Sequence, residues 1–165
     1  MTAFAHQNQE ELYWFLGKIQ GAKSILEIGS AHGHTLSMMA RFSVANSKIR
    51  TVDMGLDPEG LGNAVMGLLR AGHDADVFFG DSTSKEAVGW ARKNGPYDVV
   101  FIDGGHDFPV CRLDWENYGP MGKIVGFHDI HHPHHDVRHL WEEIKRTHKT
   151  EEKVASYMGI GMVYR

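Results

Sequence analysis

Apolar residues recur along this chain at two spacings, one typical of amphipathic helices and the other of buried strands. In the first such stretch the apolar positions are Leu12, Phe15, Leu16 and Ile19, which share one face of a helix. This stripe predicts a helix over residues 7–20 that covers a sheet.

Short apolar runs bounded by glycine or charged residues predict the strands. These runs lie at residues 25–28, 48–53, 75–79, 98–102 and 123–127, and a closing pair lies at 153–157 and 161–164. Apolar residues at helical spacing follow the first two strands, recur at 82–93 and 107–117, and resume in a last helix opened by Pro133. The helix over 82–93 has Asp81 or Ser82 as its expected N-cap.

The alternation of strands and helices predicts an α/β fold with a mostly parallel sheet of seven strands and helices on both faces. The closing pair is too tightly connected for a parallel crossover, so we expect the last strand to run antiparallel. The chain of 165 residues fits one domain, with residues 1–22 as a covering helix and residues 23–165 as the core.

The end of the first strand carries the most informative motif. Gly29 permits a sharp turn after Glu27, and Gly33 lets the next helix pack closely on the strand behind it. Amides near Ser30, at the start of that helix, point above the strand end, where α/β sheets bind nucleotide-like cofactors. Two glycines four residues apart are also compatible with a turn that binds no ligand.

The next two strand ends favour a binding site. Asp53 closes the second strand 24 residues after Gly29, where an acidic residue accepts hydrogen bonds from ribose hydroxyls. Gly80, Asp81 and Ser82 close the third strand, although Asp81 as a simple helix cap is an alternative.

Polar residues also follow the fourth and fifth strands. Asp103 and His106 flank two glycines that let the backbone pass close to a ligand, and His128, Asp129 and His131 follow strand five. Three roles are open to Asp103: binding an amino group, holding a divalent cation or orienting a substrate. The alternative for the second group is a hydrogen-bonded core histidine beside an aspartate that caps a turn.

Two further histidines have the spacing of zinc ligands on a helix. His135 and His139 are four residues apart. A helical wheel places them opposite the buried stripe of Leu140, Trp141 and Ile144, so we expect both to lie on a solvated face.

The composition of the chain bears on whether it binds nucleic acid or membranes. A net charge of −4 provides no electrostatic footprint for nucleic acid, and no targeting segment or long apolar run is present. We therefore expect a cytoplasmic protein without a membrane partner, and nucleic acid is not favoured as a partner, although a nucleotide or an RNA end stays open as a substrate. Trp14 lies opposite the apolar stripe of the first helix, where it offers a contact for a homo-oligomer.

From Ser24 onward the chain resembles class I S-adenosylmethionine-dependent methyltransferases, with a Rossmann-like sheet. The Ile-Asp-Gly-Gly-His motif at residues 102–106 and His-Asp-Ile at residues 128–130 are similar to a subgroup of small-molecule and sugar O-methyltransferases and cephalosporin-hydroxylase-like proteins. The resemblance implies that residues 23–165 bind the cofactor. It implies cofactor contacts from the strand ends, at Glu27, Gly29, Ser30, Gly33, Asp53, Met54, Asp81, Ser82 and Asp103, although Met54 as core filler is an alternative.

We therefore expect a methyltransferase that moves a methyl group from S-adenosylmethionine to a small acceptor, at an oxygen. Asp103, His106 and His128 are its candidate catalytic residues, with an imidazole as base. Asp103 and Asp129 should converge and could hold a cation such as Mg²⁺. Two alternatives remain: a non-catalytic cofactor-binding module, and a metal-dependent hydrolase or hydroxylase-like enzyme using Asp103, His128, Asp129 and His131.

Overall fold

The strands form one mixed sheet, as the sequence predicts. The computed structural model describes residues 7–165. Its strands are β1 (Ser24–Ile28), β2 (Lys48–Asp53), β3 (Asp74–Phe79), β4 (Tyr97–Ile102), β5 (Gly122–His128), β6 (Lys149–Lys153) and β7 (Ile160–Tyr164). They are ordered β3-β2-β1-β4-β5-β7-β6, and neighbours among the first five are parallel. β7 runs antiparallel to both of its neighbours, which confirms the expected last strand.

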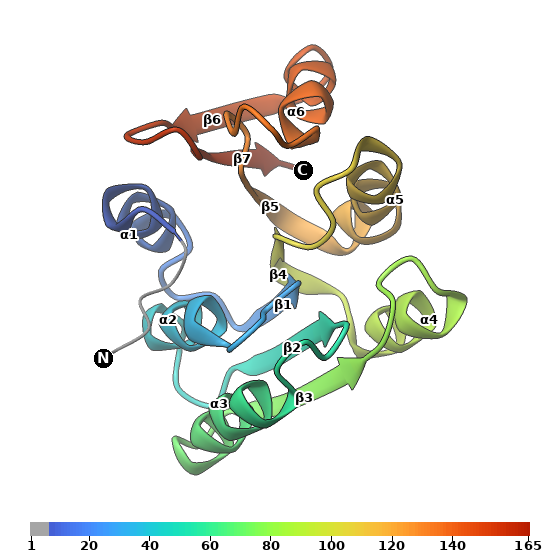
Figure 1. The fold of residues 1–165 in the computed structure, drawn as a ribbon. Coiled ribbons are helices and arrows are strands. Elements are labelled where there is room, and N and C mark those ends of the chain that lie inside the picture. The colour runs from blue at the N-terminus through green and yellow to red at the C-terminus, as the bar shows by residue number, and fades with distance from the viewer. Residues whose placement is uncertain (1–6) are drawn as a thin grey trace.

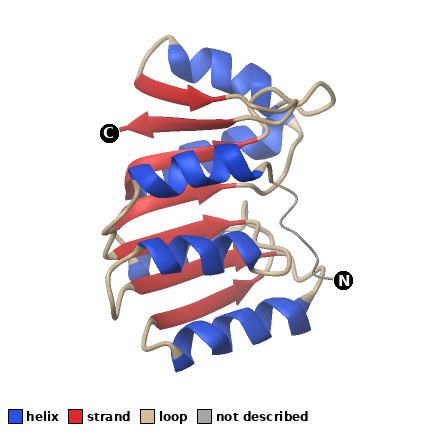
Figure 2. Cartoon of the chain, turned by 90° about the vertical axis from the view of Figure 1, so that its left-hand side faces the viewer, coloured by secondary structure: helices blue, strands red, loops and turns tan. Residues whose placement is uncertain are grey.

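Helices cover both faces of this sheet (Figures 1 and 2). They are α1 (Gln9–Lys18), α2 (His34–Phe42), α3 (Pro58–Arg70), α4 (Lys85–Asn94), α5 (Phe108–Tyr118) and α6 (Val137–Lys145). The first three pack in one apolar cluster and the last three in another. On β1, Ile25 joins the first cluster, whereas Leu26 and Ile28 join the second, because successive strand residues point to opposite faces.

The first helix is shorter than predicted. α1 begins after Asn8, whose side chain accepts hydrogen bonds from two backbone amides, and it ends at Lys18 rather than residue 20. Residues 1–6 of the expected covering segment lie outside the described residues. Trp14 is half-buried against the α1–α3 cluster, so the expectation of a side chain facing away from the apolar stripe is wrong.

Three other boundaries also differ from the prediction. α6 begins at Val137, so Pro133 lies in a run of turns before it. β6 covers residues 149–153, and residues 154–159 form the loop to β7 instead of a strand. The N-cap of α4 is Ser84, whose hydroxyl accepts a hydrogen bond from the amide of Ala87 at 3.1 Å.

The sheet topology determines where a ligand can bind. The order of the strands reverses at β1 and β4, which are adjacent and parallel at the centre. Helices that leave such strands in opposite directions create a crevice at their carboxyl ends. Among residues 7–165, no helix has both the length and the apolar composition needed to cross a membrane.

Candidate active site

A cavity of about 470 Å³ lies over the carboxyl ends of β1 to β5. This volume is within the range of small-molecule sites. The lining residues that carry the argument below come from strand ends and adjoining loops: Gly29, Ser30, Asp53, Met54, Ser82, Asp103, His106, His128, Asp129, His135, Tyr157 and Met158.

The glycine turn after β1 forms one wall and depends on Gly29. This residue has φ +81°, and a Cβ there would lie 2.2 Å from the carbonyl oxygen of Asp103. The backbone amide of Gly29 donates to the carbonyl of Val52 at 2.9 Å. Only glycine fits between the two neighbouring strand ends, as its role in the sequence motif predicts.

Asp53 fastens the glycine turn to the end of β2. One oxygen, Oδ2, accepts hydrogen bonds from the amides of Ser30 and Ala31, both at 2.9 Å. The other, Oδ1, accepts from the amide of Gly55 at 2.7 Å. Each carboxylate oxygen has two lone pairs, so the side chain retains acceptor capacity toward the cavity.

Glu27 lies beneath the turn rather than in the cavity lining. Its side chain is fully buried and accepts a hydrogen bond from the hydroxyl of Ser30, while its Oε1 has no partner within residues 7–165. Burial, opposed by the Ser30 hydrogen bond, raises the pKa of Glu27 well above its ordinary value. The side chain therefore supports the turn from below, and Glu27 does not line the cavity as the expected cofactor contact would.

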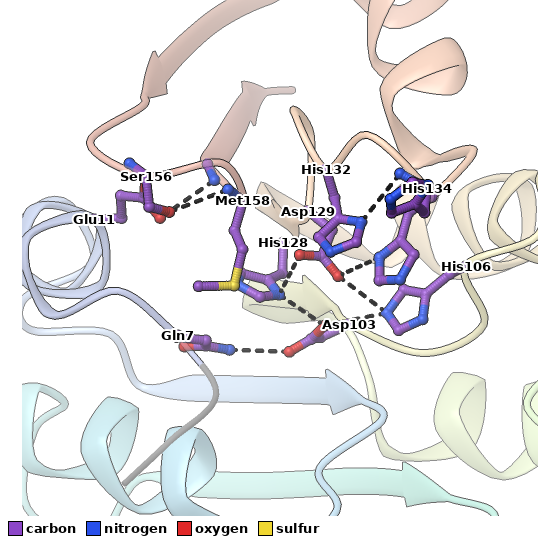
Figure 3. A network of polar contacts seen from close by, with 12 residues as sticks. Gln7, Glu11, Asp103, His106, His128, Asp129, His132, His134, Ser156 and Met158 are labelled. Atoms are coloured by element: carbon purple, nitrogen blue, oxygen red, sulfur yellow. Dashed lines mark hydrogen bonds and ion pairs between the residues drawn. The ribbon is translucent and has the colours of Figure 1, made fainter.

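The opposite wall contains the predicted acidic residues (Figure 3). Ligand atoms of Asp103, His128 and Asp129 lie within 4.8 Å of one another, which confirms that the two aspartates converge. Nδ1 of His128 is 3.2 Å from Asp103 Oδ1 and 3.3 Å from Asp129 Oδ1. Nε2 of His106 is 3.2 Å from Asp129 Oδ2. Asp129 has φ +62°, a strained backbone for a residue with a side chain.

These carboxylates and imidazoles shift one another's pKa values. Burial opposes the charge of His128, but Asp103 and Asp129 raise its pKa to about 10. Hydrogen bonds to Asp103 and Asp129 raise the pKa of His106 to about 9. Burial also opposes charge on Asp103 and Asp129, yet the imidazoles hold both carboxyl pKa values below the ordinary range. The cluster at neutral pH therefore consists of charged pairs.

The structure corrects the expectation that His135 and His139 both lie on a solvated face. Nδ1 of His135 lies 2.8 Å from Asp129 Oδ2, and its ring stacks on His106 with centroids 3.9 Å apart. His135 therefore belongs to the cavity rather than to a solvated face, because α6 begins after it. His139 is exposed, as expected. His131 is exposed and outside the lining, so the four-residue set Asp103, His128, Asp129 and His131 does not assemble.

The remaining predicted cofactor residues divide between lining and support. Met54 is 74% exposed and lines the cavity with Ser82, so it is not core filler. Asp81 lies outside the lining, and its carboxylate accepts from the amide and hydroxyl of Thr83. Gly33 caps α2, and a Cβ there would meet Ala64 of α3 at 2.6 Å, so its close contact is with a helix rather than a strand.

Sequence reasoning missed two residues near the N-terminus. Nε2 of Gln7 donates to Asp103 Oδ2 at 2.9 Å, and nothing in the local sequence indicated this contact. Glu11 is fully buried and accepts from the amides of Ala155 and Ser156 at 2.7 Å, and of Gly159 at 3.2 Å. A charged residue beside the apolar stripe of the helix was the signal in the sequence that could have pointed to Glu11.

Comparisons with known proteins agree with this geometry. None of the curated proteins matches the sequence. An O-methyltransferase from Bacillus cereus, solved with S-adenosylhomocysteine, aligns with a TM-score of 0.70 and 17% identity over 99% of this chain and 84% of that one. The O-methyltransferase TomG from Streptomyces achromogenes, solved with S-adenosylmethionine, aligns with a TM-score of 0.72 and 17% identity over 99% and 82%.

A third structure has a different named reaction. The precorrin-6y C5,15-methyltransferase from Geobacter metallireducens aligns with a TM-score of 0.69 and 12% identity over 100% of this chain and 92% of that one. At sequence identities this low, the similarity to these three structures shows a shared fold and nothing about the reaction. A family model described as a methyltransferase domain matches residues 26–130, which is more than half of the sequence. The chain therefore belongs to this methyltransferase-domain family.

Proposed function

We propose that this protein transfers a methyl group from S-adenosylmethionine to a hydroxyl group of a small molecule. The observation that carries the proposal is a single cavity with a nucleotide-type glycine turn at one end and a carboxylate–imidazole cluster at the other. The likeness to O-methyltransferases solved with S-adenosylmethionine or S-adenosylhomocysteine supports it.

The cofactor end is formed by the turn after β1 and the ends of β2 and β3. Asp53 would accept a ribose hydroxyl through the one lone pair left on Oδ1, while its three backbone contacts hold the turn. Met54, which is exposed over the cavity, would cover one face of the adenine, and Ser82 would approach its edge. Asp103 would receive the amino group of the methionine part.

The acceptor end would handle the proton. When bound, S-adenosylmethionine supplies a methyl group on a positively charged sulfur, already activated for in-line transfer. The carboxylates of Asp103 and Asp129 orient the His128 ring through Nδ1, and its buried Nε2 has no hydrogen-bond partner within residues 7–165. Although burial opposes its charge, Asp103 and Asp129 raise the pKa of His128 to about 10, so it is protonated at neutral pH. It would take the acceptor proton at Nε2 only after releasing its own, and the same carboxylates stabilise the imidazolium that forms. His106 at the cavity mouth is the second candidate base.

A divalent cation is the second part of the proposal. Asp103 and Asp129 converge as a pair of oxygen ligands should, and Mg²⁺ prefers such ligands. A cation here would position the acceptor hydroxyl and lower its pKa. Gln7 and His128 contact the Asp103 carboxylate, and His106, His128 and His135 contact that of Asp129, so a cation would replace some of these contacts.

Calorimetric titration with S-adenosylhomocysteine tests the cofactor assignment. Asp53→Ala should weaken binding by roughly 30–100-fold, because charged hydrogen bonds of about 2–3 kcal/mol are lost. A 2′-deoxyribose analogue separates the ribose contact from the support of the turn. The analogue should bind the unaltered protein less tightly than S-adenosylhomocysteine, whereas Asp53→Ala should bind the two ligands nearly equally.

Asp76→Ala is the matched control, because Asp76 is an exposed aspartate of β3 outside the cavity. Its affinity should stay within about twofold of the unaltered protein. If a folded Asp53→Ala variant retains full affinity, Asp53 does not bind ribose. If the unaltered protein binds neither S-adenosylmethionine nor S-adenosylhomocysteine, the proposed function is wrong.

A further inference from the structure

Two imidazole side chains converge on one carboxylate oxygen of Asp129 in the cavity wall. Nε2 of His106 and Nδ1 of His135 lie 3.2 Å and 2.8 Å from Oδ2 of Asp129. One ligand atom from each of the three residues lies within 4.8 Å of the others. His106 comes from the loop after β4, whereas Asp129 and His135 come from the segment between β5 and α6. The fold therefore brings two imidazoles and a carboxylate from distant positions into one group.

Well-aligned hydrogen bonds do not satisfy every polar atom of this group. Nε2 of His128 is a buried atom without a hydrogen-bond partner in the described part of the chain, whereas Nε2 of His106 and Oδ1 of Asp129 have only the ion-pair contacts with Asp129 and His128 given above. His128 and Asp129 are 4% exposed. Buried polar atoms are hydrogen-bonded in most proteins, so a wall whose polar atoms are incompletely satisfied is a place where a ligand can bind.

We propose that His106, Asp129 and His135 bind a divalent transition-metal ion that accepts imidazole nitrogen, with Zn²⁺ as its best probe. Ligand atoms about 2.1 Å from one ion are about 3.0–3.5 Å apart in octahedral or tetrahedral geometry. The distances from the two nitrogens to Asp129 Oδ2 are close to this range. Two imidazoles and one carboxylate suit zinc, iron, cobalt or nickel.

This site and the Asp103–Asp129 pair proposed above for Mg²⁺ share Asp129, so the two are alternatives, and the nitrogen donors of His106 and His135 favour the transition metal. Magnesium prefers an octahedron of oxygen atoms, and nitrogen ligands are unfavourable for it. At this wall the carboxylate oxygens face imidazole rings, and Asp103 is already hydrogen-bonded to Gln7 and His128. His106 and His135 stack with an interplanar angle of 8°, so one of the two rings must turn before both nitrogens direct their lone pairs at one ion.

Binding of this ion does not depend on methyl transfer, whereas its use as a Lewis acid toward an acceptor hydroxyl rests on the proposed function. The two assignments can therefore fail separately. Metal binding is measured on the full chain without cofactor, and S-adenosylhomocysteine binding is measured on chelator-treated protein without metal.

Calorimetry with Zn²⁺, Co²⁺ and Mg²⁺ on chelator-treated protein tests the site. We expect one tight site for Zn²⁺, and Mg²⁺ at least about 100-fold weaker. His135→Ala should weaken Zn²⁺ binding by roughly 100-fold or more, and His106→Ala should do the same. Bound Co²⁺ should show visible absorption bands that change in both variants. Circular dichroism verifies that each variant is folded. If His135→Ala is not folded, His135→Gln replaces it.

His139→Ala and His134→Ala are the matched controls, because both histidines are exposed in the same histidine-rich segment. Each should leave Zn²⁺ affinity within about twofold. The proposal is overturned if either control loses the tight site, since the metal would then be bound by surface histidines. It is also overturned if Mg²⁺ binds as tightly as Zn²⁺, or if both His106 and His135 can be removed without loss.

Discussion

Two buried aspartates of this protein have opposite environments. Asp53 accepts hydrogen bonds from three backbone amides, so its negative charge is compensated although the side chain is only 7% exposed. Asp114 of α5 is fully buried, and neither of its carboxylate oxygens has a hydrogen-bond partner within residues 7–165. Burial raises the pKa of Asp114 to about 6. An unpaired buried carboxylate destabilises the folded state once it ionises.

Asp114→Asn should therefore stabilise the protein in a pH-dependent way. The folded state binds this proton more tightly than the unfolded state, so stability falls as pH rises from about 3.8 to about 6. Near pH 4 the variant and the unaltered protein should have the same free energy of unfolding. At pH 8 the free energy of unfolding of the variant, measured with urea, should be higher by about 3 kcal/mol. If the two proteins differ in free energy of unfolding by the same amount at pH 4 and pH 8, the pKa of Asp114 does not change on folding and the prediction is wrong.

At the scale of elements, the loop between β6 and β7 is held by a residue far away in sequence. Glu11 of α1 accepts hydrogen bonds from three amides of this loop. The loop carries Tyr157 and Met158 into the cavity lining. The first helix therefore positions part of the wall at which an acceptor would bind.

Glu11→Ala should loosen the loop and destabilise the protein by roughly 2–4 kcal/mol, since several charge-assisted hydrogen bonds are lost. Hydrogen exchange should accelerate at residues 154–159, while the central strands stay protected. The neighbouring Glu10→Ala is the control, because within residues 7–165 the Glu10 side chain forms only an exposed ion pair with Lys153, at 2.5 Å. Such pairs contribute about 1 kcal/mol or less. Equal effects of the two variants would contradict the anchoring role of Glu11.

At the scale of the whole molecule, the mostly parallel sheet, its antiparallel last strand and the convergence of the strand ends were predicted from local patterns. Parallel strands separated by helices place their carboxyl ends at one edge, so Asp53, Asp103 and Asp129 were predicted to share a site without any tertiary information. The position of His135 could not be predicted in this way. It depends on where α6 begins, and helix boundaries are determined by packing as much as by sequence. Gln7 likewise reaches the site only through the path of the chain.

The cavity draws on both halves of the sheet, and this has a consequence for stability. Gly29 and Asp53 belong to the β1–β3 half, whereas Asp103 and Asp129 follow β4 and β5. A cofactor that binds only the assembled cavity stabilises the whole fold by mass action. S-adenosylhomocysteine at 100 times its dissociation constant should raise the free energy of unfolding by about 2.7 kcal/mol.

For a chain of this length, that gain corresponds to an increase of roughly 5–10 °C in Tm, measured by differential scanning fluorimetry. The shift should grow with ligand concentration and be much smaller in Asp53→Ala at the same concentration. Hydrogen exchange should slow both at residues 29–31 and at residues 103–106, because the ligand spans the two halves. Protection confined to one half would mean that the ligand does not bridge β1 and β4, and the placement of the methionine part near Asp103 would be wrong.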